Sequence, residues 1–141
     1  MFDPRQDGIS HINVYSQGKT ELGRWLTNFA HVHVITADGP FESIEGYWYW
    51  LSCKDDNLRA LYGFAAKEYG RKIGARDWME TSDFQTKIKD AIRVKIWSNA
   101  KMMAELQKLK LPLVHYYVFS GVVRTAPKAQ WVIDYLSTFK K

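Results

Sequence analysis

An acidic residue beside a run of aromatic residues is the feature of this sequence that most directly suggests chemistry. Glu45 precedes the run YWYW at 47–50 by a single glycine. Ser43 is placed to cap a helix, because its hydroxyl can accept a backbone N–H of the first turn. Glu45 would then lie in that turn, where negative charge is favoured. A helix that is apolar nearly all round is a buried one, so we expect Glu45 to lie among aromatic rings as a candidate functional acid. The alternative is an acid that caps its own helix and pairs with a surface lysine.

A second charged residue stands where an apolar one is expected. Ser82 with Gln85 forms a capping box, and the helical pattern that follows has an apolar stripe made of Phe84, Ile88, Ala91, Ile92 and Ile96. At about 100° per residue, Lys95 lies only ~20° from Ile88, near the middle of that stripe. Either its stem carries the ammonium to water, or the ammonium reaches an acid or a phosphate inside the fold.

Several other kinds of site are not supported by the sequence. Neither G-x-G-x-x-G nor G-x-x-x-x-G-K-[ST] occurs, so the usual nucleotide-binding loops are missing. His31 and His33 could point two imidazoles to one face of a strand, but no further zinc ligands are evident. Cys53 is the single cysteine, and in an aromatic-rich segment it is more typical of a small buried hydrophobe than of a nucleophile. We therefore expect no metal and no cofactor.

Length and composition indicate a globular domain. The chain has 141 residues, a net charge of +5 and a pI of about 9.3, which suits a phosphate-bearing partner without proving one. No apolar run is long enough for a membrane span, no signal-peptide core begins the chain, and one cysteine allows no internal disulfide. We expect a cytoplasmic protein without a membrane partner. The lysines are spread along the chain, which disfavours a pure nucleic-acid-binding module.

The elements that must position these residues are predicted in the order strands, helices, a strand and a helix. Period-two and β-branched patterns predict strands at 9–15 and 32–36, with a turn at 37–40. A helix should begin after Ser43. A second, capped by Asp55 or Asp56 and with Tyr62 in its apolar stripe, should continue to Ile73 and stop at Gly74. The remaining predictions are helices from 82 and at 101–109, a strand at 114–120, a loop or strand at 121–127 and a helix at 130–139. The order predicts one α+β domain over 1–141, a small β-sheet packed with several helices.

Several segments together resemble the NADAR domain family, named for its association with NAD and ADP-ribose metabolism. In order, the matching segments are INVY at 12–15, GRWLTNF at 23–29, SIEGYW at 43–48, AAKEYGR at 65–71, RDW at 76–78 and AIRVKIW at 91–97. Three positions depart from the pattern, the first being Thr27 in place of a serine. Gly46 replaces a histidine, and His115 stands where the family has a glutamate. The glycine-rich motif that should follow is not recognisable, although Trp131 could replace its tryptophan.

The resemblance implies hydrolysis of an N-glycosidic bond to ribose. One branch of the family acts on phosphoribosylamino-pyrimidine intermediates of riboflavin synthesis, and another removes ADP-ribose from guanine bases in DNA. Carried over residue by residue, the resemblance implies that Glu45 is the catalytic residue. The substrate-binding residues it implies are Asn28, Phe29, Tyr47, Trp48, Lys67, Arg71, Trp78 and Lys95.

The expected substrate is an ADP-ribosylated nucleotide or nucleic acid. The basic charge and the missing C-terminal motif favour removal of ADP-ribose from guanine over the riboflavin branch. Two non-enzymatic alternatives stay open. One is an inactive binder of an ADP-ribose species, and the other is a basic nucleic-acid-binding module whose aromatic residues stack on bases.

Overall fold

The computed structural model describes residues 2–74 and 82–141. Two units are distinguished by their internal packing: Asn28–Asn99 form one, which we call the central unit, and Met1–Thr27 with Ala100–Lys141 form the other, which we call the terminal unit. Both contain helices and short strands, so the fold class is α+β, as expected. No helix in the described part of the chain has both the length and the apolar composition needed to cross a membrane.

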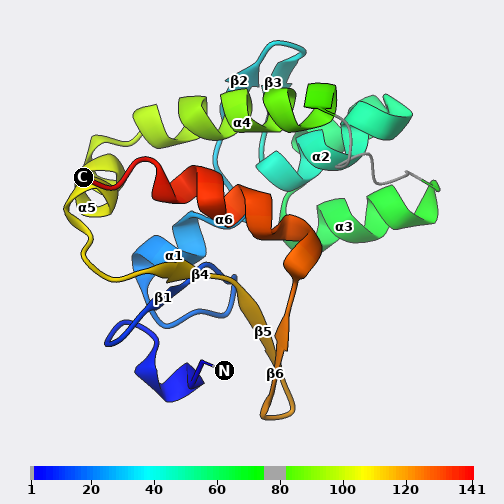
Figure 1. The fold of residues 1–141 in the computed structure, drawn as a ribbon. Helices are drawn as coiled ribbons and strands as arrows, with labels where there is room; N and C mark the ends of the chain where they lie inside the picture. Colours follow the sequence, from blue (N-terminus) through cyan, green and yellow to red (C-terminus); the bar gives the residue numbers. More distant parts are fainter. Residues whose placement is uncertain (1, 75–81) are drawn as a thin grey trace. The chain divides into compact units, whose positions relative to one another are not determined.

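The central unit is built from a β-hairpin and helices (Figure 1). Its elements are β2 (Val34–Thr36), β3 (Gly39–Phe41), α2 (Ile44–Cys53), the 3-10 helix η2 (Asp56–Ala60), α3 (Gly63–Lys72) and α4 (Ser82–Trp97). The strands pair antiparallel with Val34 opposite Phe41. Helix α2 packs against α3, η2 and α4. At the α2–α3 contact, a Cβ on Gly70 would lie 2.4 Å from Cγ of Tyr49, so only glycine permits this approach of the two helices.

The terminal unit contains the N-terminal and the C-terminal segments of the chain. Its elements are η1 (Pro4–Gln6), β1 (Ile12–Asn13), α1 (Glu21–Trp25), α5 (Ala100–Lys108), β4 (Leu113–Val114), β5 (Tyr116–Phe119), β6 (Val122–Thr125), η3 (Pro127–Ala129) and α6 (Gln130–Ser137). Strand β1 pairs parallel with β4, with Ile12 opposite Leu113. The Asn13 side chain continues this pairing, because its amide donates to the Tyr116 carbonyl and accepts from the Tyr116 N–H, both at 3.0 Å.

Several predicted elements are confirmed by the structure. Ser43 caps α2, and this helix contains the predicted aromatic segment. Gly74 follows the end of α3 with φ +78°, the left-handed conformation that ends helices. Helix α4 begins at the predicted Ser82, the break at 98–99 separates α4 from α5, and the five predicted stripe residues of α4 are buried.

Four predictions about strands and helices are corrected. The strand expected at 9–15 is reduced to Ile12–Asn13, because Gly8 donates to the His11 carbonyl and closes a turn before it. The expected turn at 37–40 is partly strand, since Gly39 and Pro40 belong to β3. The helix expected from 56 to 73 is two pieces, η2 and α3. The expected small β-sheet is, within the described residues, three two-stranded sheets.

The break between η2 and α3 has a tertiary cause. In a continuous helix the carbonyls of Arg59 and Leu61 would accept from residues four positions later. Here the Arg59 carbonyl accepts from the Glu42 N–H at 2.9 Å, and the Leu61 carbonyl accepts from the Ser43 hydroxyl at 2.8 Å. These two bonds hold the segment that precedes α2 against η2.

Candidate functional site

The start of α2 is anchored by Ser43. This serine is fully buried, and its Oγ accepts a 2.9 Å hydrogen bond from the Gly46 N–H while it donates to the Leu61 carbonyl. Glu45 lies in the first turn of α2 and is half-buried. The expectation of an acid in the first turn is met, but Glu45 is less enclosed than a helix that is apolar on every side would make it, because several α2 residues are only partly covered.

The N-termini of α2 and α3 converge on the dipeptide Asn28–Phe29. The Asn28 carbonyl accepts from the Glu45 N–H at 2.9 Å, and the Phe29 carbonyl accepts from the Gly63 N–H at 3.0 Å. Each carbonyl satisfies one of the first-turn amides that a helix leaves unbonded. The positive ends of two helix dipoles therefore lie beside these two residues, which favours negative charge nearby.

Lys67 and Phe64 of α3 lie next to the same dipeptide. The rings of Phe29 and Phe64 meet edge-to-face with centroids 5.1 Å apart. Nζ of Lys67 lies 5.9 Å from the Phe29 ring centroid. Arg71 follows Lys67 by one helical turn on the same face of α3 and is exposed. The structure thus brings Asn28, Phe29, Glu45 and Lys67 together.

Tyr47 and Trp48 are packed inside the central unit. The Tyr47 hydroxyl donates a 2.6 Å hydrogen bond to Oδ2 of Asp38, and its ring lies 4.8 Å from that of Phe41. Burial and the Asp38 carboxylate raise the pKa of Tyr47 well above its usual range. The Trp48 ring meets Phe84 of α4 edge-to-face at 4.8 Å. Both rings have core positions in this structure, and contact of either with a ligand remains a prediction.

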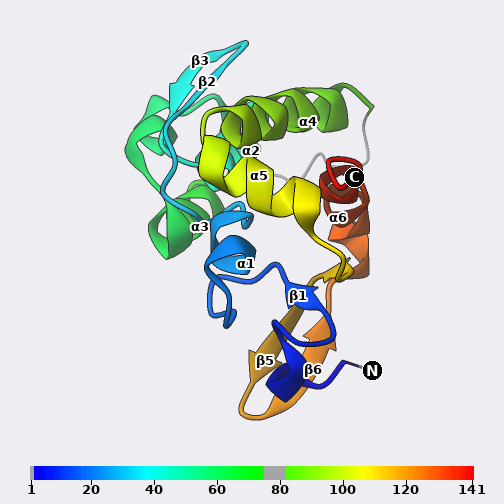
Figure 2. The ribbon, with the colours of Figure 1, turned by 90° about the vertical axis from the view of Figure 1, so that its left-hand side faces the viewer.

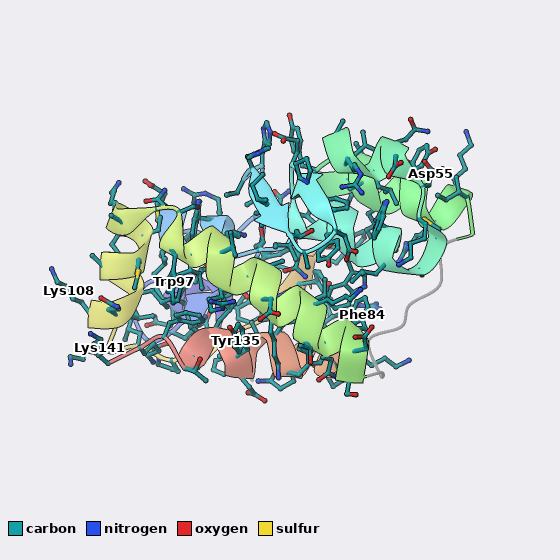
Figure 3. All side chains as sticks on the ribbon, turned by 90° about the horizontal axis from the view of Figure 1, so that it is seen from above. Asp55, Phe84, Trp97, Lys108, Tyr135 and Lys141 are labelled. Carbon is teal, nitrogen blue, oxygen red and sulfur yellow. The ribbon has the colours of Figure 1, made fainter. Side chains whose placement is uncertain are left out.

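Lys95 is buried in α4, with only 2% of its surface exposed. Desolvation lowers its pKa from 10.5 to about 7. Phe84 and Trp97 mark the two ends of α4 (Figure 3), and Lys95 is only two residues from Trp97. It therefore lies about 16 Å along the helix axis from Phe84, where Trp48 packs. Its place in the substrate site is a prediction, and Trp78 lies outside the described residues.

Gly46 occupies the position where the NADAR pattern has histidine. A Cβ here would lie 2.5 Å from the Leu58 carbonyl oxygen and 3.2 Å from that of Leu61. Both atoms are backbone, so an imidazole could be accommodated only if η2 moved away from α2. The close packing of α2 against η2 therefore requires glycine at this position, where the family pattern has histidine.

His115 also has a structural position. Its Nδ1 donates a 2.6 Å hydrogen bond to the Val14 carbonyl, and its ring lies 4.8 Å from that of Tyr117. Burial lowers the pKa of His115, with the bond to Val14 opposing that shift. This residue joins β4 and β5 to the chain next to β1. Trp131 lies in α6 and is half-buried.

Sequence reasoning missed a small cluster of polar and aromatic side chains. His31 and His33 do point to a common partner, which is Glu42: His31 Nε2 lies 3.0 Å from Oε1 and His33 Nδ1 lies 2.5 Å from Oε2. These two bonds lower the pKa of Glu42, with His33 the larger cause. Tyr62 stacks on His31 at 4.1 Å, although the helical pattern placed it in a buried stripe. In the ranges 2–74 and 82–141, no cluster of three or more His, Cys, Asp or Glu is arranged to hold a metal ion.

Comparison with known proteins identifies the fold. No protein-family model and no curated protein sequence matches the chain. The NMR structure of the Escherichia coli protein YbiA does match, with a TM-score of 0.65 over 97% of this chain and 92% of that one. The chain has a YbiA-like fold. Sequence identity to YbiA is 17%, so this likeness establishes the fold and leaves the activity to be argued from the residues.

Proposed function

We propose that this protein is a divergent NADAR domain spanning residues 1–141, and that it is an N-glycosidase that cleaves a ribosyl N-glycosidic bond. The substrate we favour is ADP-ribose attached to a guanine base of DNA. Three observations support the proposal: the ordered motifs from 12 to 97, the YbiA-like fold, and the position of Glu45. The last carries most weight, because this half-buried acid is bonded through its N–H to Asn28, whose neighbour Phe29 has Lys67 beside its ring.

Glu45 suits the chemistry of ribosyl transfer to water. Cleavage of this bond passes through an oxocarbenium-like state, with positive charge on the anomeric carbon and the ring oxygen. A carboxylate close to that carbon stabilises the charge and accepts a proton from the attacking water. Both roles require an ionised carboxylate, and negative charge is favoured in the first turn of a helix.

The neighbours of Glu45 suit a substrate that carries a diphosphate. The N-terminal ends of α2 and α3 contribute partial positive charge at Asn28–Phe29, and Lys67 adds a full charge one turn into α3. Arg71 is one turn farther and exposed, within reach of a second phosphate group. The Phe29 and Phe64 rings offer an apolar surface to a base.

A non-catalytic binder of ADP-ribose is the second candidate, and Gly46 is the observation that favours it. The backbone of η2 excludes any side chain at this position, so the imidazole of the family pattern is missing here. A protein that has lost a catalytic group while keeping the surrounding site would bind its substrate without cleaving it.

A product assay separates these possibilities. The full chain is incubated with ADP-ribosylated guanine in a DNA strand and, separately, with a phosphoribosylamino-pyrimidine, and the released sugar phosphate is quantified by chromatography. We expect free ADP-ribose from the first substrate and its loss in Glu45→Gln. Release only from the pyrimidine assigns the other branch. Binding of the modified strand with no release from either substrate supports the binder and contradicts the enzyme.

A further inference from the structure

The β5–β6 hairpin of the terminal unit has one face turned to solvent. Residues directly opposite in an antiparallel pair lie on the same face, and Tyr117 is opposite Arg124 while Phe119 is opposite Val122. These four residues form what we call the hairpin face. Phe119 is 72% exposed, Val122 54% and Tyr117 40%. Exposed aromatic residues gathered on one surface mark an interaction site more often than chance placement.

The opposite face anchors the hairpin, so the exposed face is held in a defined position. Tyr116 is buried and its hydroxyl is hydrogen-bonded to His11 Nε2 at 2.6 Å. The Tyr15 hydroxyl donates to the Val118 carbonyl at 3.4 Å, which ties β5 to the segment that follows β1. The turn that joins β5 to β6 lies at the end of the hairpin away from α6 in both views (Figure 1, Figure 2). The rings of Tyr15 and His115 flank Tyr117 edge-to-face and hold it in place, which leaves it 40% exposed, while Phe119 is 72% exposed.

The net positive charge of the chain comes from residues 100–141, the segment that carries this hairpin. Residues 100–141 contain seven Lys and Arg but only two Asp and Glu, a net charge of +5. Residues 1–99 contain thirteen of each, a net charge of zero. The lysines are indeed spread along the chain, but the acidic residues are not. Within the segment, Arg124 lies on the hairpin face itself and Lys128 follows β6 in η3, and both are exposed.

Rings and cations at this spacing match an unpaired nucleic-acid strand. Every base offers a π-face on which an aromatic side chain can stack, while the phosphates that link the bases require cations alongside. A protein partner would use the positive charge only if its own surface were acidic, whereas every nucleic-acid strand carries phosphates. A second copy of the chain would bring the same positive charge to the interface.

We infer that the hairpin face binds single-stranded DNA. Bases stack on Tyr117 and Phe119, and the strand's phosphates pair with Arg124 and Lys128. The surface lies in the terminal unit, whereas the residues of the proposed glycosidase site lie in the central unit. The inference goes beyond that function, because it concerns the strand and holds whether or not a bond in it is cleaved.

Binding of an unmodified strand tests the inference. The full chain is titrated into a fluorescein-labelled oligothymidine of about 16 nucleotides, the upper end of the site sizes known for such surfaces. Anisotropy is recorded between about 50 and 200 mM salt. We expect Tyr117→Ala and Phe119→Ala each to weaken binding about 5- to 150-fold, the loss that follows removal of one stacked base. Arg124→Gln should lower the salt slope by about 0.7, the contribution of one phosphate contact.

Matched variants separate stacking from other effects. Phe119→Leu keeps an apolar side chain but removes the ring, and it should bind as weakly as the alanine variant. Trp97→Ala removes another exposed aromatic, in α4, and Lys72→Gln removes an exposed charge in α3; both should bind as the unsubstituted protein does. Thermal unfolding confirms that each variant is folded.

Four results would overturn the inference. The first is no binding by the unsubstituted protein, and the second is unchanged binding by the hairpin variants or by Phe119→Leu. The third is tighter binding of the same oligothymidine paired with its complement than of the single strand. The fourth is a dimer in sedimentation that Phe119→Ala dissociates, with no affinity for DNA. The last result assigns the surface to a second copy of the chain. Because no glycosidic bond is assayed, failure here leaves the glycosidase proposal to its own product assay.

Discussion

The backbone N–H of Glu45 donates a 2.9 Å hydrogen bond to the carbonyl oxygen of Asn28. The acid proposed for catalysis and a residue expected to bind the substrate are therefore joined through their main chains. This bond does not depend on either side chain, so substitutions at both positions should leave the local backbone in place. Variants at Glu45 consequently test chemistry rather than folding.

We expect Glu45→Gln to reduce kcat/KM by about 10²–10⁴-fold, the usual contribution of a general base, with more lost if charge stabilisation also disappears. The reduction is measured on whichever substrate the unsubstituted protein cleaves. Glu105→Gln in α5 is the matched control and should leave kcat/KM unchanged. Normal turnover by a folded Glu45→Gln protein would remove Glu45 from the mechanism.

We expect Gly46→Ala to destabilise the protein by about 1–3 kcal/mol, the usual cost of forcing a methyl group into a filled space. The new Cβ would lie 2.5 Å from the backbone oxygen of Leu58, which no side-chain rotation can relieve. Urea unfolding measures the change. Helix propensity alone predicts the opposite sign, a gain of up to about 1 kcal/mol, so a stabilised variant would show that α2 and η2 are not packed as described. Ser52→Ala, in the same helix, should change stability little.

Tyr47→Phe should lower the free energy of unfolding by about 1.5–3 kcal/mol at neutral pH, because it removes a hydrogen bond to an ionised carboxylate. That bond is the main reason why the pKa of Asp38 lies below its ordinary 3.8, with Lys87 also contributing. A lowered carboxyl pKa stabilises the fold above pH 3.8, and this stabilisation is lost as the pH falls through the folded-state value.

The difference between Tyr47→Phe and the unsubstituted protein should therefore shrink below that pH. Tyr69→Phe is the control, since its hydroxyl donates to Asp55 at 2.8 Å at a more exposed position and should cost less. A constant difference at every pH would mean that Asp38 is not the partner that matters.

Lys95→Met should remove much of the pH dependence of stability in the alkaline range. The pKa of Lys95 is about 7 in the folded chain against an ordinary 10.5. Between these values the unfolded chain binds more protons than the folded one, so stability rises with pH across this window. With about 1.4 kcal/mol per pKa unit, the rise is several kcal/mol as an upper bound.

Urea unfolding below, within and above that window measures the effect. Lys95→Met should be more stable than the unsubstituted protein at the acidic end and should show a flatter profile. Lys72→Met, at an exposed position of α3, should keep the unsubstituted profile. If the stability of Lys95→Met rises with pH as steeply as that of the unsubstituted protein, Lys95 is not the source of the rise. Its ammonium would then be stabilised by a nearby negative charge in the folded protein.

The features that the sequence predicted correctly depend on signals within a few residues of each other. Ser43 and the aromatic run that follows define α2, Gly74 ends α3, and the period of 3.6 places Lys95 inside α4. Capping, glycine conformations and helical periodicity act over one or two turns, so they can be recognised without knowing what the chain packs against.

The same local signals also located Glu45 and grouped it with an aromatic segment. They could not show that Phe64 would face Phe29, or that Tyr62 would leave its expected stripe to stack on His31. Both depend on where α3 begins, and that depends on hydrogen bonds from the residues before α2 to the carbonyls of Arg59 and Leu61.

By itself, then, the sequence determined the α+β class, most of the helices, the place of Lys95 on the apolar stripe of α4 and the acid in the first turn of α2. Only the tertiary structure decided the parallel pairing of Ile12 with Leu113, the convergence of two helix N-termini on Asn28–Phe29, and the exclusion of a side chain at Gly46. The physical reason is distance along the chain. These contacts involve backbone groups that every residue carries, and they join segments far apart in the sequence. No residue type or spacing therefore predicts them.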